Sequence, residues 1–358
     1  MAAQILLKIS ALLFFNALIS QSIFANTSHN HIKAHAPIGV MGDHMHKAGE
    51  WMFSYRYMSM SMEDNLQGSN NISPEEIRDA GLGLRVVPLQ MTTDMHMFGA
   101  MYAPSDKLTL MLMVNYIEKE MDHLTFMMPM GPMMPMPMNE TGIFTTKTSG
   151  IGDTKIGALY SLRSGDNTNI HLNLGLSIPT GKINHTDQIL MPMNDGALIS
   201  KRLPYPMQLG SGTYDIEPGI TYAGTRNAWD WGSQIKMTIR LDDNDEGYSL
   251  GDQTQITSWS GYRFTRWLSG SLRLTYTDAD QINGQDNAIK DLMVQSAKSE
   301  NFGGERIDLG VGITLIGTEG AQKGHRLALE YVTTIDQNAN GIQMEMQDML
   351  TIGYQFSL

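Results

Sequence analysis

The chain has 358 residues, a net charge of −12, 35 glycines, 29 methionines and no cysteine. An acidic chain without a basic cluster excludes nucleic acid as a partner. The lack of cysteine excludes disulfides, thiolate metal sites and a cysteine nucleophile. Charged residues make up 17% of the chain, below the usual value of roughly 25%, and together with the glycine content this favours an all-β protein.

Residues 1–25 predict a signal peptide, because Lys8 precedes an apolar run over 9–20 and a small residue, Ala25, offers a cleavage site. That run is too short to span a membrane as a helix, and no later stretch reaches about 20 apolar residues. We therefore expect an exported protein. Its N-terminal tail, rich in histidine and methionine, should cover 26–48 in the periplasm, and the folded domain should cover 49–358.

The folded domain shows repeated segments in which apolar and polar residues alternate, as they do in strands that have one apolar face. At the C-terminus, for example, Ile352, Tyr354 and Phe356 share one face, while Thr351 and Gln355 share the other. The predicted strands cover 49–62, 93–103, 107–117, 150–162, 168–178, 213–224, 228–241, 254–264, 267–277, 305–316, 325–334 and 346–358.

The links between these strands alternate in length. Short turns are predicted near 104–106, 163–166, 225–227, 265–266 and 317–324, and long links at 63–92, 118–149, 179–212, 242–253, 278–304 and 335–345. An even number of strands with this alternation is typical of a transmembrane antiparallel up-and-down β-barrel with short periplasmic turns and long outer loops. We expect about 12 strands in the cell outer membrane, with lipid and the barrel assembly machinery as partners. A soluble β-sandwich or cupin is the alternative.

Four runs of the sequence carry a family resemblance: SGIGDTKIGALYSL at 149–162, LGLSIPTGK at 174–182, GSGTYDIEPGITY at 210–222 and the terminal IGYQFSL. The chain resembles the outer-membrane proteins of the phenol-degradation meta-pathway family, which are often labelled transporters. The resemblance covers most of the mature chain and implies a small barrel that passes aromatic compounds. One difference is that the chain ends in Leu358, with Phe356 two residues earlier, where many such barrels end in an aromatic residue.

The methionines concentrate in the first part of the chain, where 20 of the 29 lie between Met41 and Met138. Alternation places a first group on the lumen side of three predicted strands, because the aromatic residues between them belong on the lipid side. A second group follows in the proline-rich link 118–149, and a third lies beside histidines in the tail. The candidate soft-metal ligands are His44, Met45, His46, Met58, Met60, Met62, Met95, Met97, Met111, Met113, Met134, Met136 and Met138.

Thioether is a soft ligand that selects Cu(I), and imidazole suits copper as well. The main hypothesis is therefore an outer-membrane channel or binding protein that handles Cu(I) or Ag(I), although no cofactor is certain. Methionine also suits adaptable apolar surfaces, so one alternative is passive uptake of aromatic or other hydrophobic molecules. A structural barrel without a transport role is the other alternative. No nucleophile elbow or zinc-helix motif predicts an enzyme. Five charged residues are predicted to set the polarity of the lumen: Arg56, Asp215, Glu217, Lys236 and Arg240.

Overall fold

A computed structural model describes residues 36–127, 141–193 and 197–358. The signal peptide predicted at 1–25 and the loop methionines Met134, Met136 and Met138 lie outside these residues. Among the described residues, no helix has the length and apolarity needed to cross a bilayer.

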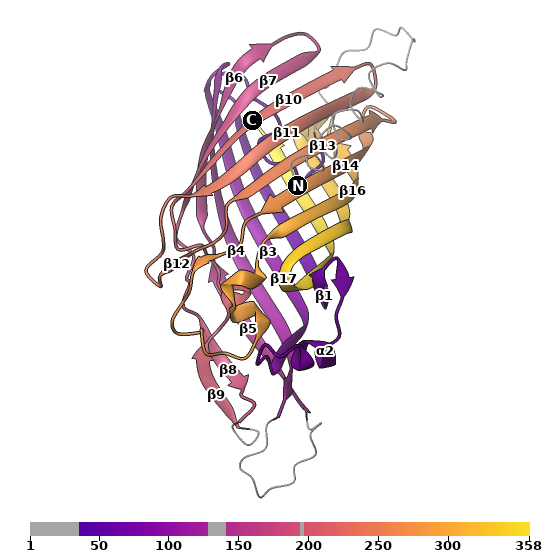
Figure 1. Cartoon of the computed structure of the whole chain (residues 1–358). Helices are drawn as coiled ribbons and strands as arrows, with labels where there is room; N and C mark the ends of the chain where they lie inside the picture. The colour runs from indigo at the N-terminus through magenta and orange to yellow at the C-terminus, as the bar shows by residue number, and fades with distance from the viewer. Residues whose placement is uncertain (1–35, 128–140, 194–196) are drawn as a thin grey trace, which may run out of the picture.

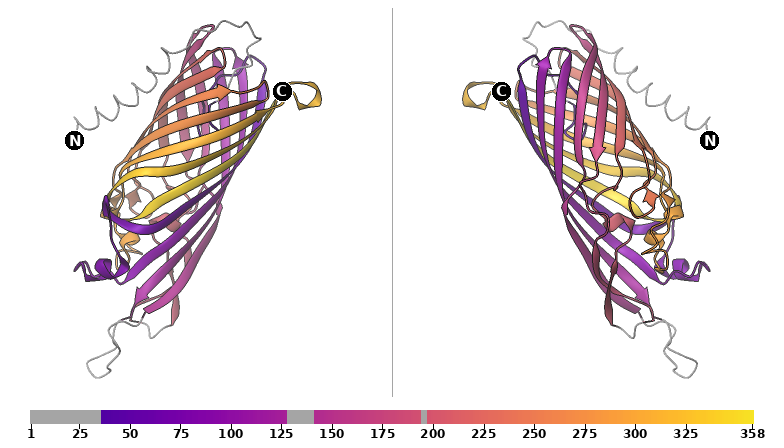
Figure 2. Two further views of the ribbon diagram at one scale, coloured as in Figure 1. Left: turned by 90° about the vertical axis from the view of Figure 1, so that its right-hand side faces the viewer. Right: turned by 90° about the vertical axis from the view of Figure 1, so that its left-hand side faces the viewer.

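The chain forms a closed antiparallel β-barrel whose strands follow one another around the ring (Figure 1). The wall is continuous from both sides, and its strands are strongly tilted (Figure 2). The wall strands are β1 (Trp51–Gly68), β3 (Val86–Ser105), β4 (Leu108–Phe126), β5 (Thr141–Ile151), β6 (Thr154–Ser164), β7 (Thr168–Ile178), β10 (Asp215–Arg226), β11 (Trp229–Arg240), β13 (Gln253–Arg263), β14 (Leu268–Ala279), β16 (Gly304–Ile316) and β17 (His325–Ser357).

The last element, β17, supplies two passes through the wall. Its first part pairs with β16 from Arg326 to Ala339, and its second part pairs with β1 as far as Ser357. Between them Gly341 has a φ of +66°, a conformation that glycine adopts without strain. In contrast, β5 and β6 together make a single pass of the wall, because β5 pairs with the outer half of β4 and β6 pairs with the other half. The ring therefore contains twelve passes, as the sequence predicted.

Three predicted long links are wrong in their bounds, because the strands continue through much of them. β1 extends to Gly68, while β4 and β5 occupy most of the predicted link 118–149. Residues 335–345 are not a loop but the tip of the β17 hairpin. In these outer parts the alternation of apolar and polar residues fades, as at Glu118 and Glu120, which both point outward.

The remaining long links lie at the end of the barrel opposite the short turns, at the bottom of Figure 1. They carry β2 (Asn70–Asn71), α2 (Pro74–Asp79), β8 (Thr186–Leu190), β9 (Leu198–Arg202), η1 (Tyr205–Met207), β12 (Tyr248–Ser249), β15 (Asn283–Gly284), η2 (Gln295–Ala297) and η3 (Ser299–Asn301), and η4 (Gly320–Gln322) lies in a short turn. Side chains of the links, including Tyr205, Tyr248 and Leu292, form an apolar cluster with Val86 and Phe144 of the wall. The links thus fold over the outer end of the barrel.

The outer surface of the wall is apolar and the inner surface is polar. Phe98, Leu112 and Leu174 are exposed on the outside, whereas Asn173 and Gln234 are buried on the inside. A large hydrophobic face that none of the described residues covers fits a surface surrounded by lipid.

Candidate functional site: a methionine-walled chamber

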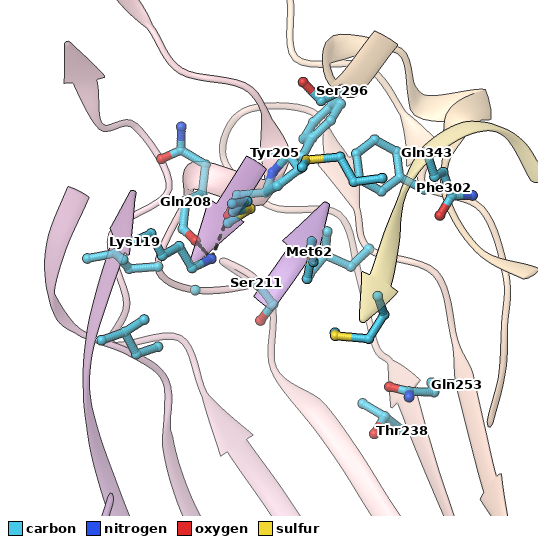
Figure 3. A pocket seen from close by; sticks show the side chains of 18 of the residues that line it. Met62, Lys119, Tyr205, Gln208, Ser211, Thr238, Gln253, Ser296, Phe302 and Gln343 are labelled. Atoms are coloured by element: carbon cyan, nitrogen blue, oxygen red, sulfur yellow. Dashed lines mark hydrogen bonds between the residues drawn. The ribbon is translucent and has the colours of Figure 1, made fainter. Parts of the chain in front are cut away.

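A cavity of about 550 Å³ lies inside the barrel beneath the apolar cluster of the links (Figure 3). We call it the chamber. Tyr205 and Phe302 reach it from the links, Met62 from β1, and Thr238 and Gln253 from β11 and β13. Its volume is in the range of pockets that hold small molecules.

A row of methionines crosses four neighbouring passes of the chamber wall. In the strand register Met62 of β1 is opposite Met346 of β17 and Met91 of β3, and Met91 is opposite Met121 of β4. All four side chains line the chamber. Directly opposite residues on one face of an antiparallel pair are close neighbours, so the row forms a continuous thioether surface.

The sequence had placed Met62 in a lumen strip but missed Met91, Met121 and Met346. Met91 is an even number of residues away from Met95 and Met97, so it lies on the same face of the strand, and this spacing could have identified it. It was overlooked because the segment before residue 93 was predicted to be a link.

The other strip residues also lie on the inner face of their strands. Met58 is opposite Met95, and Met60 is opposite Thr93. The remaining predicted strip residues in strands are Met97, Met111 and Met113. The structure therefore brings the predicted strand methionines to one side of the lumen, although Met97 is already level with Arg56, nearer the short turns.

The opposite wall of the chamber is polar and contains ion pairs. Glu217 contacts Lys155 Nζ at 2.5 Å and Lys236 Nζ at 2.7 Å, and Asp215 pairs with Arg240. Four of the five residues predicted to set the polarity of the lumen therefore take part in these ion pairs. The fifth, Arg56, lies nearer the short turns, where its Nη1 donates to Met41 Sδ at 2.6 Å.

Residues 36–48, part of the tail expected in the periplasm, lie inside the barrel at the end with the short turns. We call them the inner segment. Wall side chains hold their backbone: Arg326 donates to Ala36 O at 2.6 Å, Asn173 donates to Gly42 O at 2.9 Å, and Gln234 donates to Met41 O at 3.0 Å. The segment therefore occupies the lumen between the chamber and the short turns.

A second methionine row lies beside the inner segment. Met52 of β1 is opposite Met101 of β3, which is opposite Met111 of β4. Met45 packs against this row. Four methionines from four parts of the chain thus pack together, with Met52 and Met101 buried and Met45 and Met111 partly buried. We call them the thioether cluster.

Two histidines flank Met45. His44 Nδ1 lies 2.8 Å from Asp43, and the His44 and His46 rings are 4.9 Å apart. Burial, followed by the neighbouring His44, lowers the pKa of His46 to about 4, so this imidazole is neutral at pH 7. Its Nε2 is buried without a hydrogen-bond partner among the described residues. Within the same residues, histidines and carboxylates form no group of three or more that could hold a metal ion.

Comparison with known proteins identifies the fold. No protein-family model and no curated protein sequence matches the chain. The COG4313 outer membrane channel from Pseudomonas putida F1 is similar in structure, with a TM-score of 0.56 and 12% identity over 89% of this chain and 99% of that one. The KdgM porin has a TM-score of 0.39 and 9% identity, and the match covers 86% of this chain and 99% of that one. A mutant of the TodX monoaromatic hydrocarbon channel has a TM-score of 0.40 and 10% identity, and the match covers 87% of this chain and 91% of that one.

At these identities the comparison with the COG4313 channel shows the fold alone. The chain has the fold of outer-membrane β-barrels, and the apolar outer face described above agrees with that fold.

Proposed function

We propose that the protein is an outer-membrane channel for small solutes with an apolar, including aromatic, body. The observation that carries this proposal is the chamber, whose thioether row and aromatic rings face a polar wall within one lumen. Thioether sulfur makes favourable contacts with aromatic rings and adapts to different shapes. The neighbour with the similar fold is named as a channel, which supports a transport role over a purely structural one.

The channel in this proposal is narrowed at both ends, by the links on the outside and by the inner segment beside the short turns. Single-channel recording in planar lipid bilayers tests it. The full chain should give small currents, and a variant lacking residues 36–48 should give larger ones because the lumen beside the short turns is then empty. If neither protein conducts ions, the channel proposal is wrong.

The apolar part of the proposal is tested by adding phenol to the open variant and measuring block of the current. Replacing Met62 and Met346 by Asn puts amides where two thioethers lined the chamber. We expect phenol block to weaken about tenfold, which corresponds to ~1.4 kcal/mol. Met193→Asn is the matched control, because Met193 is exposed on a link. Equal block in all three proteins would remove the support for an apolar solute.

Handling of Cu(I) or Ag(I) is a second candidate function, favoured by the thioether cluster beside His46. Neutral imidazole and thioether are both ligands for monovalent copper. A Cu(I) titration against a chromophoric chelator should show tight binding by the wild type and loss of that binding when Met45, Met52, Met101 and Met111 are changed to Leu. The Met58/Met60/Met62→Leu variant should keep it. Equal, weak binding by all three proteins would exclude this function.

A further inference from the structure

Lys119 is a cation on the inner face of β4 that has no carboxylate partner among the described residues. It lines the chamber two residues before Met121, and its Nζ donates to the carbonyl oxygens of Pro206 and Gln208, each at 2.6 Å (Figure 3). Among the ion pairs of the described residues none includes Lys119. An ammonium group has three donors, so a third N–H is available beside the cavity.

The carboxylates around the chamber are already bound to other groups. Glu217 is shared by Lys155 and Lys236, and Asp215 is paired with Arg240. Asp153 accepts from the backbone N–H groups of Gly181 at 2.9 Å and Ser211 at 2.7 Å. Each therefore already has its donors and does not neutralise Lys119.

The formal charges of the polar wall cancel, because Lys155, Lys236 and Arg240 balance Asp153, Asp215 and Glu217. Arg306, which also lines the chamber, is paired with Asp308. Lys119 on β4 therefore adds one positive charge that no carboxylate of the described lining balances. The whole chain carries a net charge of −12, so the sign at the chamber is the reverse of the sign of the molecule. Burying a charge that no opposite charge balances costs free energy, and an anion bound in the chamber offsets that cost.

We infer that the preferred solute of the chamber is an amphipathic anion, an apolar or aromatic body that carries one negatively charged group. The body would contact the row of Met62, Met91, Met121 and Met346, and the charged group would lie at Lys119. Lys155, on the polar wall, would add positive potential in the same chamber. This inference rests on the proposed channel function and adds the charge of its solute.

Lys119 also has a structural role, because its two carbonyl acceptors lie within η1 and directly after it, and these bonds hold that link in the lumen. That role alone would not give the channel a preference for the sign of a solute. It would equally not explain an effect of Lys155, which has no hydrogen bond to η1 among those of the described residues. The two lysines together therefore distinguish solute binding from loop anchoring.

The test uses two permanently charged solutes of similar size, benzenesulfonate and benzyltrimethylammonium. Their relative permeabilities are obtained from reversal potentials of the full chain in planar bilayers under asymmetric salts. We expect the wild type to favour benzenesulfonate by a factor on the order of ten, equivalent to ~1.4 kcal/mol. Lys119→Met and Lys155→Gln should each reduce this preference, while Lys119→Arg should keep it.

Lys147→Gln is the matched control, since Lys147 is exposed on β5 and pairs with Glu120 outside the lumen. A channel that conducts potassium chloride but shows no preference, or prefers the cation, would overturn the inference and leave the channel function intact. Absence of any current, even after residues 36–48 are deleted, would instead overturn the channel function. A loss of preference in Lys119→Met without any change in Lys155→Gln would reduce Lys119 to an anchor of η1 and also contradict the inference.

Discussion

Glu330 joins the barrel wall to the inner segment. Its side chain is fully buried, and it accepts from Arg273 Nε at 2.6 Å and from the backbone N–H of Gly39 at 2.8 Å. Removing one partner of a buried ion pair leaves the other charge uncompensated, at a cost of roughly 3–5 kcal/mol. We therefore expect Glu330→Ala to lower the free energy of unfolding by about this amount, measured by urea titration in lipid vesicles.

Two further variants separate the ion pair from the docking of the segment. Glu330→Gln keeps an acceptor oxygen and should lose less stability than Glu330→Ala. Gly39→Val should release the inner segment, because a Cβ at this position would lie 2.5 Å from Glu330 Oε2 and 2.6 Å from Arg273 Nη2. Single-channel current in planar bilayers reports release, because a released segment leaves the lumen beside the short turns open. If Gly39→Val and the wild type carry equal currents, Gly39 does not control docking.

Individual inward residues could be predicted from the sequence in those parts of a strand where the outward side chains are apolar. Arg56 and Lys236 were recognised because their neighbours on either side are aromatic or aliphatic. Lys119 was not, because it lies between Glu118 and Glu120 and no contrast between the two faces marks it. Its role also depends on two backbone carbonyls more than eighty residues later, and no local pattern encodes such a contact.

Insertion of each wall strand into lipid depends on the difference between its apolar outer face and its polar inner face. In β11, Ile235 is exposed on the outside and Thr238 lines the chamber. Arginine on the lipid face near the middle of a bilayer costs about 2–4 kcal/mol, whereas a lumen substitution costs much less. Ile235→Arg should therefore reduce the fraction of protein that inserts into lipid vesicles, and Thr238→Arg should insert normally. Equal insertion would mean that the faces of β11 are assigned incorrectly.

The ends of the strands were the least predictable part of these elements. Alternation identifies a strand by its apolar outer face, and that face exists only where lipid covers it. β1, β3 and β4 continue beyond this zone, where polar residues such as Glu63 and Asp122 also point away from the lumen. Backbone pairing holds these extensions together, and it is independent of the polarity that the sequence reveals.

In the molecule as a whole, the barrel wall could be predicted from the sequence, but the inner segment in its lumen could not. The wall follows from local alternation and from turn lengths, so the closed barrel was predicted correctly. The inner segment is held by polar side chains of β7, β11 and β17 that bind its backbone. Such contacts join residues up to 291 positions apart and involve backbone atoms of the segment, so no side-chain pattern in the segment marks them.

Closure of the barrel can be tested with a disulfide, because the natural chain has no cysteine. Ser59 of β1 is opposite Leu350 of β17 at the seam, and both belong to the outward faces of their strands. Opposite residues in antiparallel strands have Cα atoms about 4.5–5.5 Å apart, which is within the usual range for a disulfide. The Ser59→Cys/Leu350→Cys variant should therefore form one bond on oxidation.

This bond should change the mobility of the denatured chain on a non-reducing gel relative to that of the reduced chain, since it joins segments near opposite ends of the sequence. Ser59→Cys/Thr351→Cys is the control. Thr351 is only one residue further along the same strand, but its side chain points into the lumen, so a bond to the outward position 59 would require the wall to open. Equal oxidation of the two variants would show that the register between β1 and β17 is not fixed, and the barrel would then lack a defined seam.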